Sequence, residues 1–381
     1  MEKQKEKYLF LYLRTGGGHL APARSISNYI NKNYSDSIET ILLDGFEKTN
    51  KLVKFIIEDG YRITQIKFPW IYEFFYVLYK IPFVSRTNNF LLSFFIRPNL
   101  SDILLKEKPD KILIFHFFLI KPLYDVVEKE RLKTKTFTIV TDPFTAHPIW
   151  FLRKDQNFIV FSDKLKKKCI EKNIPENRVN VFPFIIDEKF SQTNLSGNVC
   201  EIKNQLGFQE NKKIVLLLGG GEGIPRGLAI VSKLIEKNIT AEIAVICGRN
   251  NELYNDLKSY LNRNNILHVK LFRYVDFVEK LIRISDVVIT KCGASTFMEI
   301  LVSKKIPVVI DYIWEQEKGN VDFLTENNLG IYEKRIGKLP GLITKIISGD
   351  KEYLTLRNNI INSEFKNGLN EVASFIMKGK S

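Results

Sequence analysis

The sequence has few of the features that mark disulfide-rich, zinc-binding or membrane-spanning proteins. Its four cysteines are widely scattered and form no Cys-x-x-Cys pair, which argues against a zinc site or a disulfide framework and indicates reduced thiols. No uncharged run reaches the ~18 residues that a membrane-spanning helix needs. An Asp-x-Asp pair, which could share a metal ion, is also absent. We therefore expect neither a metal cofactor nor a spanning helix.

The N-terminus lacks the apolar stretch and cleavage site of a signal peptide. The first residues read Met-Glu-Lys-Gln-Lys-Glu-Lys and run directly into a strand-like segment at 8–13. We expect a cytosolic chain, and one that meets a membrane only peripherally, from the cytoplasmic face.

The composition is that of a globular protein with excess positive charge. At 381 residues the chain suits two packed domains, because single cores stop growing beyond about 250 to 300 residues. The hydrophobic fraction of 45% is far from that of disordered chains. The 57 Lys and Arg outnumber the 43 Asp and Glu, giving +14. Such a charge suits a nucleic acid, a nucleotide or an anionic membrane, and does not choose among them.

Two successive series of strands alternate with helical stretches. Strands are expected at 8–13, 38–43, 111–115, 136–141 and 158–161, and then at 213–218, 243–247, 269–271, 286–290 and 306–310. A polar stretch at 191–198 separates the series, so we place the domain boundary near residue 190. This α/β pattern predicts two doubly wound, Rossmann-like domains, 1–190 and 191–381, that face a cleft. A C-terminal helix is available to pack back on the first domain.

The segment 51–97 departs from this pattern. It holds 13 aromatic residues, where the chain-wide 12% predicts roughly six, and seven basic residues against three acidic ones. One interpretation is a helix buried between the sheet and the rest of its domain. The other is an amphipathic, basic-rimmed surface that dips into lipid, with residues such as Trp70 and Phe74 at its apolar face.

A glycine-rich loop follows the first strand. It reads Thr-Gly-Gly-Gly-His from Thr15 to His19 and leads into a helix with Pro22 near its first turn. The glycines, Gly17 and Gly18 among them, allow close approach of a ligand, and a helix N-terminus favours an anion or a sugar phosphate. With an ordinary pKa of ~6.5, His19 is competent to take a proton from an attacking hydroxyl.

Two other functions remain open from the residues alone. Gly16, Gly18 and Ala21 satisfy the loose dinucleotide pattern Gly-x-Gly-x-x-Gly/Ala, which would suit an NAD-dependent oxidoreductase with Glu39 as the ribose carboxylate. The positive charge and the lysines between 164 and 168 would suit a nucleic-acid-binding protein, although no recognised nucleic-acid motif accompanies them.

The second series of strands is followed by loops of similar chemistry. Gly219–Gly223 follows one strand, with no Gly-Lys-Ser/Thr to make an ATPase phosphate loop. Small and hydroxyl residues at 291–296 open a helix, where they suit a diphosphate, and Glu299 lies one turn further on, within reach of ribose hydroxyls. The same residues also fit a simple helix cap. The loop at 311–320 offers the amide and carboxylate groups that a hexose needs.

Together these loops resemble the monogalactosyldiacylglycerol synthases and bacterial diacylglycerol glucosyltransferases and, more distantly, the N-acetylglucosaminyltransferase that makes lipid II. The motifs, which stand in order along nearly the whole chain, are Thr15–His19, Thr141-Asp142 with His147-Pro148, Gly219–Gly223, Cys247–Asn250, Thr290–Glu299 and Gln316–Asn320. The resemblance implies an inverting, metal-independent transferase of the glycosyltransferase B fold. It would use a UDP-hexose as co-substrate and a lipid such as diacylglycerol as acceptor, at an anionic membrane surface and without nucleic acid.

The same resemblance implies roles for individual residues. His19 would be the base that activates the acceptor hydroxyl in the first domain, with Asp142 as a supporting carboxylate. The donor would be held in the second domain by Gly220, Gly221, Ser295 and Thr296 at the phosphates, the backbone of Val275 at uracil, Glu299 at ribose, and Gln316, Glu317 and Asn320 at the hexose. Related galactosyl enzymes have Pro-Gly-Thr where this chain has Ala294-Ser295-Thr296. The choice between glucose and galactose therefore stays open.

Overall fold

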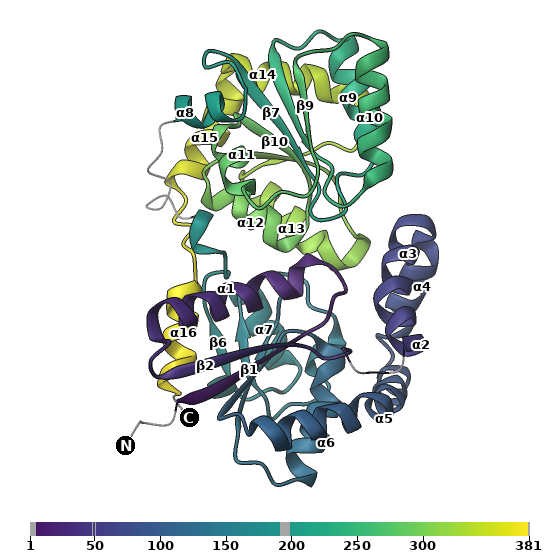
Figure 1. Ribbon diagram of the computed structural model, residues 1–381, viewed down its shortest axis with the longest axis vertical. Coiled ribbons are helices and arrows are strands. Elements are labelled where there is room, and N and C mark those ends of the chain that lie inside the picture. Colours follow the sequence, from purple (N-terminus) through teal and green to yellow (C-terminus); the bar gives the residue numbers. More distant parts are fainter. Residues whose placement is uncertain (1–4, 48, 50, 191–198, 380–381) are drawn as a thin grey trace. The chain divides into compact units, whose positions relative to one another are not determined.

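The computed structural model describes residues 5–47, 49, 51–190 and 199–379 (Figure 1). The chain divides into two compact units, the first comprising 1–187 and 367–381 and the second 188–366. The segment 191–198, where the sequence predicts the change of domain, lies outside the described residues.

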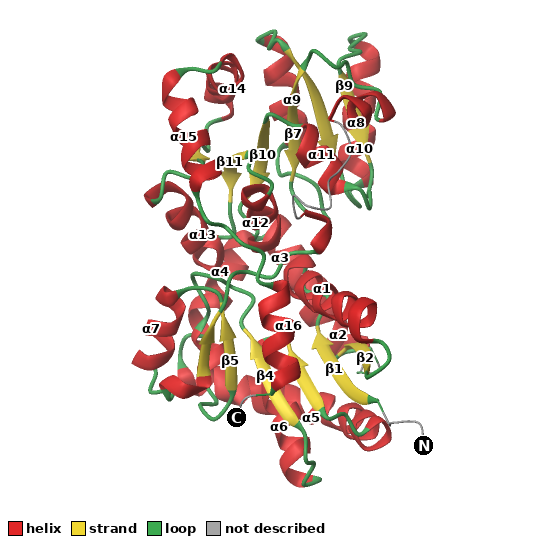
Figure 2. Cartoon of the chain, turned by 90° about the vertical axis from the view of Figure 1, so that its left-hand side faces the viewer, coloured by secondary structure: helices red, strands yellow, loops and turns green. Residues whose placement is uncertain are grey.

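The first unit is built on a parallel sheet, whose order within the described residues is β2-β1-β3-β4-β5-β6. Its strands are β1 (Glu6–Tyr12), β2 (Ile38–Asp44), β3 (Lys111–Ile114), β4 (Lys135–Ile139), β5 (Asn157–Val160) and β6 (Val179–Val181). Its helices are α1 (Gly17–Tyr34), α2 (Lys51–Lys54), α3 (Gly60–Lys67), α4 (Pro69–Leu78), α5 (Pro82–Glu107), α6 (Ile120–Lys129), α7 (Asp163–Glu171) and α16 (Leu369–Lys378). Helices α1 and α16 pack side by side on one face of the sheet (Figure 2).

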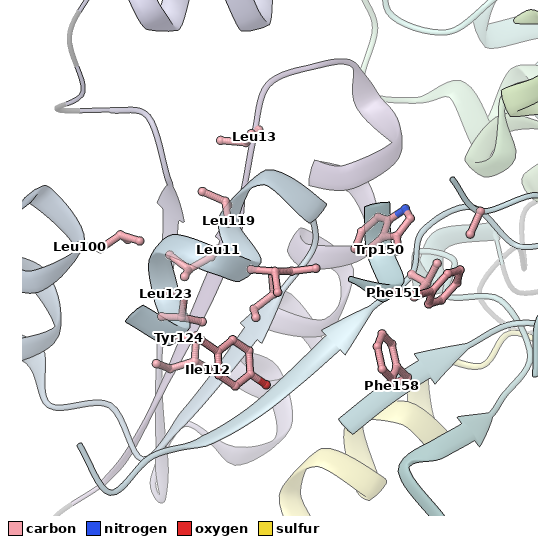
Figure 3. Close-up of a cluster of buried hydrophobic side chains, with 14 of the residues drawn as sticks. Leu11, Leu13, Leu100, Ile112, Leu119, Leu123, Tyr124, Trp150, Phe151 and Phe158 are labelled. Carbon is pink, nitrogen blue, oxygen red and sulfur yellow. The ribbon is translucent and has the colours of Figure 1, made fainter. Parts of the chain in front are cut away.

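The strands are apolar along most of their length because both faces of the sheet are covered. In β1, the residues from Tyr8 to Tyr12 are all buried, and every residue of β3 is buried. Such continuous apolar runs are typical of parallel strands between two helical layers. Figure 3 shows members of this buried apolar cluster, among them Leu11 of β1, Leu123 and Tyr124 of α6, and Trp150, Phe151 and Phe158.

The C-terminal helix α16 belongs to the first unit although it follows the second in the chain. The side-chain amide of Asn367 donates to the carbonyl of Ile186 at 2.6 Å and its oxygen accepts from the Ile186 N–H at 3.0 Å. At the other end, Lys111 Nζ donates to the Met377 carbonyl at 2.9 Å and Lys135 Nζ to the Gly379 carbonyl at 2.7 Å. Lysines at a helix C-terminus satisfy its last carbonyls and complement its dipole.

The second unit repeats the architecture, with the strand order β12-β11-β10-β7-β8-β9 in its described part. Its strands are β7 (Lys213–Leu218), β8 (Ala241–Ile246), β9 (Val269–Phe272), β10 (Val287–Lys291), β11 (Ile306–Asp311) and β12 (Ile331–Tyr332). Its helices are α8 (Val199–Gln205), α9 (Gly227–Glu236), α10 (Asn251–Arg263), α11 (Val278–Ile284), α12 (Ala294–Val302), α13 (Trp314–Glu326), α14 (Leu339–Ser348) and α15 (Lys351–Asn362). All its paired strands are parallel.

The predicted fold class, two doubly wound parallel sheets, is confirmed. All the strands expected from the sequence are present, with ends that differ by a few residues. The position predicted for Pro22 is wrong by about one turn. Helix α1 begins at Gly17, so Pro22 lies inside the helix and Gly17 and Gly18 form part of its first turn.

Candidate functional site

In the first unit, the glycine-rich loop joins β1 to α1 at the carboxyl edge of the sheet. Gly16 has φ +121°, a conformation that L side chains rarely adopt, so this position favours glycine. A Cβ atom added to Gly16, Gly17 or Gly18 would meet no other group within 4 Å. Packing therefore does not explain the glycines at 17 and 18, and the space beside them is open to a ligand.

His19 lies in the first turn of α1 and is almost completely buried. Its Nδ1 is 2.8 Å from the hydroxyl of Thr141, and its ring meets that of His116 edge-on, with centroids 4.5 Å apart. Burial lowers the pKa of His19 to about 4, although the backbone carbonyl of Phe115, which accepts a hydrogen bond from the imidazole, opposes this shift. The imidazole is therefore neutral near pH 7, with one nitrogen able to accept a proton.

Asp142 follows Thr141 at the end of β4. Its Oδ2 accepts a hydrogen bond from the indole Nε1 of Trp150 at 3.1 Å. The Trp150 ring is fully buried and its centroid lies 6.4 Å from that of His19. The structure thus brings His19 and Asp142 into one cluster, with the tryptophan ring beside both. The role of Asp142 as a supporting carboxylate stays a prediction.

His116 belongs to this cluster and was missed by the sequence reasoning. It follows β3, is almost completely buried, and its Nδ1 accepts from the N–H of Phe118 at 3.2 Å, which leaves its proton on Nε2. Burial and the neighbouring His19 lower its pKa well below the ordinary value. The available signal was its position: a histidine directly after a buried strand, at the same sheet edge as His19.

The aromatic segment 51–97 is exposed over much of its surface. Trp70 and Phe74 are 68% and 60% exposed, which rules out the interpretation that these two side chains lie in a core. Other large apolar side chains exposed on α2 to α5 and the turns between them are Leu52, Phe55, Ile56, Phe68, Phe75, Val77, Ile81, Phe83, Phe90, Leu91, Phe94, Phe95 and Leu105. The opposite face of α5 is buried through Leu92, Ile96 and Leu100. Helix α5 therefore carries one core face and one exposed apolar face.

Polar contacts hold the aromatic helices to the sheet beside the His19 loop. His147 accepts the N–H of Ile149 at Nδ1, so its Nε2 carries the proton that is donated to the backbone carbonyl of Tyr76 in α4, at 3.0 Å. At the end of β2, the buried carboxylate of Asp44 lies 3.0 Å from Lys54 Nζ of α2. The start of the aromatic segment, at Lys54, and its middle, at Tyr76, are thus fixed to the edge where His19 lies.

In the second unit, the loop Gly219–Gly223 after β7 is shaped by close backbone contacts. A Cβ at Gly219 would collide with the backbone of Gly223, and one at Gly248, where φ is +62°, would collide with that of Gly221. The N–H of Arg249 also donates to the Gly221 carbonyl at 2.8 Å. At Gly220 and Gly221, however, a Cβ would meet nothing within 4 Å. The loop is closely packed on one side and open on the side of these two residues.

Helix α12 presents its N-terminus at the same sheet edge. Its N-cap is Gly293, with no side chain to cap the first N–H groups. In the described part of the chain, the buried hydroxyl of Ser295 has no hydrogen-bond partner. Free N–H groups, a positive dipole end and an unsatisfied hydroxyl together form a seat for an oxyanion such as a diphosphate. Thr296 and Glu299 follow on the same helix.

Two residues on α13 that are predicted to bind the sugar donor, Glu317 and Asn320, form hydrogen bonds with backbone groups of the protein. Glu317 Oε2 accepts from the N–H of Ile313 at 2.6 Å, and its Oε1 lies 3.8 Å from Lys291 Nζ. Asn320 is buried and donates from Nδ2 to the Cys292 carbonyl at 2.9 Å. These contacts fix the start of α13 against the loop after β10. The sequence reasoning gave Lys291 no role, although it stands within one of the motifs.

Val275 and Gln316 follow strands β9 and β11, which β10, β7 and β8 separate in the sheet. Val275 is half-buried in the segment after β9, next to Tyr274, whose ring carries the Arg249 guanidinium at 5.0 Å from its centroid. Gln316 is half-buried in the first turn of α13. The roles predicted for these two residues, at uracil and at the hexose, stay predictions.

The described residues contain neither a cluster of metal ligands nor a membrane-spanning helix. Within 5–47, 49, 51–190 and 199–379, no group of three or more His, Cys, Asp or Glu side chains is placed to hold a metal ion. Among the helices of this same part of the chain, none is both long and apolar enough to cross a bilayer.

The two halves of the chain match two family models in succession. Residues 19–185 match the model "Monogalactosyldiacylglycerol (MGDG) synthase", and residues 214–371 match "Glycosyltransferase family 28 C-terminal domain". The first range contains His19 and the second contains all of the predicted donor residues.

Similar proteins cover about nine tenths of the chain. Monogalactosyldiacylglycerol synthase 1 of Arabidopsis thaliana is 28% identical over 90% of this chain, which covers 64% of that longer protein, less than two thirds. Processive diacylglycerol beta-glucosyltransferase of Staphylococcus carnosus is 25% identical over 91% of this chain and 86% of its own length. The crystal structure of Anabaena HepE in complex with UDP-glucose is similar with a TM-score of 0.59 at 13% identity, over 98% of both chains. At such low identity, this likeness concerns the fold alone.

Proposed function

We propose that this chain, which belongs to the monogalactosyldiacylglycerol synthase family of glycosyltransferases and has the glycosyltransferase B fold, transfers a hexose from a UDP-sugar to diacylglycerol or a close relative. The observation that carries the proposal is the similarity to the staphylococcal diacylglycerol glucosyltransferase, which extends over nearly all of both proteins. The order of the six motifs supports it.

In the first unit, His19 acts as the general base. Its neutral imidazole takes the proton of the lipid hydroxyl while that oxygen forms a bond with the anomeric carbon of the hexose. The bond from that carbon to the UDP oxygen breaks on the opposite face, so the configuration inverts. With a pKa of about 4, His19 is in its basic form at neutral pH, and the same shift lowers its strength as a base. Open space beside Gly17 and Gly18 leaves room for the acceptor.

In the second unit, the N-terminus of α12 and the loop at Gly220 and Gly221 hold the diphosphate. The uncapped N–H groups and the unsatisfied Ser295 hydroxyl donate to its oxygens, and they stabilise the charge that grows on UDP as it leaves. We infer that these donors do the work that a metal ion does in other transferases. Glu299 would bind the ribose, Val275 the uracil, and Gln316 the hexose.

The aromatic helices α4 and α5 are the membrane-docking surface. Their exposed Trp and Phe side chains bury apolar area in the headgroup region, and neighbouring basic residues meet anionic lipids at about 1 kcal/mol each. The acceptor lipid then reaches His19 without leaving the bilayer. The protein would accordingly be peripheral, on the cytoplasmic face.

Ligand-induced stabilisation distinguishes this function from the NAD-dependent alternative. UDP at 100 times its Kd should stabilise the protein by about 2.7 kcal/mol, and NADH should leave its melting temperature unchanged. Protection by NADH and none by UDP would favour an oxidoreductase. Incubation with UDP-glucose and UDP-galactose, each with diacylglycerol vesicles, then identifies the hexose. Tight, sequence-selective retention on DNA at physiological salt would instead favour a nucleic-acid-binding protein.

A further inference from the structure

The immediate partner of His19 is a hydroxyl rather than a carboxylate. Thr141 Oγ1 lies 2.8 Å from His19 Nδ1, and both residues are buried. A hydroxyl both donates and accepts, so this contact is compatible with a proton on either ring nitrogen of His19. The choice matters for catalysis, because a neutral imidazole offers a lone pair only at the nitrogen that does not carry the proton.

The reaction itself selects one of these arrangements. After His19 has taken a proton, both of its ring nitrogens are N–H donors, and the group beside Nδ1 must then be an acceptor. The Thr141 hydroxyl can be this acceptor without rotating only if it already accepts a hydrogen bond from Nδ1–H before the reaction. In that arrangement the lone pair is on Nε2, the nitrogen that the Thr141 contact leaves available.

Other groups also surround His19, among them the backbone carbonyl of Phe115, which accepts a hydrogen bond from the imidazole. Asp142 Oδ2 is bonded to the Trp150 indole, and His116 is fixed with its proton on Nε2 by the Phe118 N–H. The His116 ring packs edge-on against the His19 imidazole, and this contact limits rotation of the imidazole about its side-chain bonds.

We propose that Thr141 is the positioning residue for His19: its hydroxyl accepts a hydrogen bond from Nδ1–H, and so keeps the lone pair on Nε2 directed to the acceptor. The effect of Thr141 on catalysis rests on the proposed function. The tautomer of His19, however, is a property of the protein alone. An uncharged orienting group also agrees with the depressed pKa of His19, since a carboxylate at the same place would raise it.

The tautomer is measured directly by two-dimensional ¹H–¹⁵N NMR of the full chain labelled at histidine. The sequence has four histidines, and the His19→Ala variant identifies the signals of His19. At pH 7 the proposal predicts a protonated Nδ1 and an unprotonated Nε2. A His19 with its proton on Nε2 would overturn the proposal whether or not the protein transfers sugar.

Two variants test the consequence for catalysis. Thr141→Val keeps the shape and removes the hydroxyl, so kcat should fall by roughly 10- to 100-fold, the usual cost of a misplaced catalytic group, with the KM for UDP-sugar unchanged. Thr141→Ser restores the hydroxyl and should recover most of that loss. Full activity of a folded Thr141→Val protein, or an unchanged His19 tautomer in it, would contradict the positioning role. If both variants lost their activity and also their near-ultraviolet circular dichroism signal, Thr141 would have a packing role. That outcome would equally contradict the positioning role.

Discussion

Trp150 donates its indole N–H to the carboxylate of Asp142 at 3.1 Å, and in doing so joins the end of β4 to the core of the first unit. Trp150 is fully buried, and its ring lies beside those of His19 and Phe117. A hydrogen bond from a buried donor to a carboxylate contributes about 1.5 to 3 kcal/mol. The candidate catalytic cluster is thus part of the packed core rather than a mobile loop.

Replacing Trp150 with Phe tests this connection. The change keeps most of the ring but leaves Asp142 without its indole donor, so the free energy of unfolding should fall by about 2 to 4 kcal/mol, including the smaller ring volume. Urea denaturation at pH 7 measures it. Phe151→Leu, elsewhere in the same core, is the control for packing alone. Equal activity per folded molecule in wild type and Trp150→Phe would show that Asp142 has no part in catalysis through this contact.

His19 makes the stability of the protein depend on pH. Its folded pKa, about 4, lies below the ordinary value of 6.5, so the unfolded chain binds more protons between these pH values. Stability is therefore fully present above about pH 6.5 and decreases as the pH falls towards 4, by an amount on the order of 3 kcal/mol for this group. His116, whose pKa is lowered in the same direction, adds to the loss.

Denaturant titrations at pH 7 and pH 5 measure this effect. In His19→Asn the difference in unfolding free energy between the two pH values should be smaller than in the wild type. An identical difference in both proteins would show that His19 is not buried in its neutral form.

If the proposed donor site is correct, replacing two polar side chains of the second unit should have different effects, one on UDP binding and the other on stability. Ser295 has a buried hydroxyl without a partner, so Ser295→Ala should change stability by less than about 0.5 kcal/mol while weakening UDP binding. Asn320 donates to the buried Cys292 carbonyl, so Asn320→Ala should cost about 1 to 3 kcal/mol of stability. Calorimetric titration with UDP and urea denaturation of both variants separate the two roles. UDP affinity that is unchanged in Ser295→Ala would remove Ser295 from the donor site.

The exposed aromatic face predicts membrane binding that depends on Trp70 and Phe74. Their joint replacement by Ser should reduce binding to anionic vesicles and activity on vesicle-bound lipid, and should spare UDP affinity. Because both side chains are more than half exposed, stability should hardly change. Leu92→Ser, on the buried face of the same helical segment, is the matched control and should destabilise the fold. Vesicle flotation at 0.1 M and 1 M salt measures the electrostatic part, since the Debye length falls from ~10 Å to ~3 Å.

The main strands could be predicted because buried parallel strands are continuous apolar runs. Both glycine loops could be predicted because few other residues adopt the backbone conformations that glycine allows. Strands β6 and β12 were not predicted. They are edge strands of three and two residues, and they exist through pairing with β5 and β11 rather than through any local pattern. The early start of α1 was hidden because the helix begins with two glycines, Gly17 and Gly18, which have low helix propensity.

The site could be predicted where a single residue type carries the chemistry, as for His19. It was harder to predict where tertiary contacts decide which side chains become hydrogen-bond partners. The sequence could not reveal that Asp142 bonds to Trp150, that Thr141 lies at Nδ1 of His19, or that His116 completes the cluster. His19, His116 and Thr141 follow separate strands, β1, β3 and β4, and meet because the carboxyl ends of parallel strands share one edge.

The central claim is that His19 activates the hydroxyl of a lipid for attack on a UDP-hexose. Its most direct test is the transfer of radiolabel from UDP-glucose or UDP-galactose to diacylglycerol in vesicles, measured for the wild type and for His19→Ala after both proteins are shown to bind UDP equally. We expect a labelled glycolipid with the wild type and a kcat lower by about 10² to 10⁴ in His19→Ala. No lipid product from either nucleotide sugar, or equal rates for the two proteins, would contradict this role of His19.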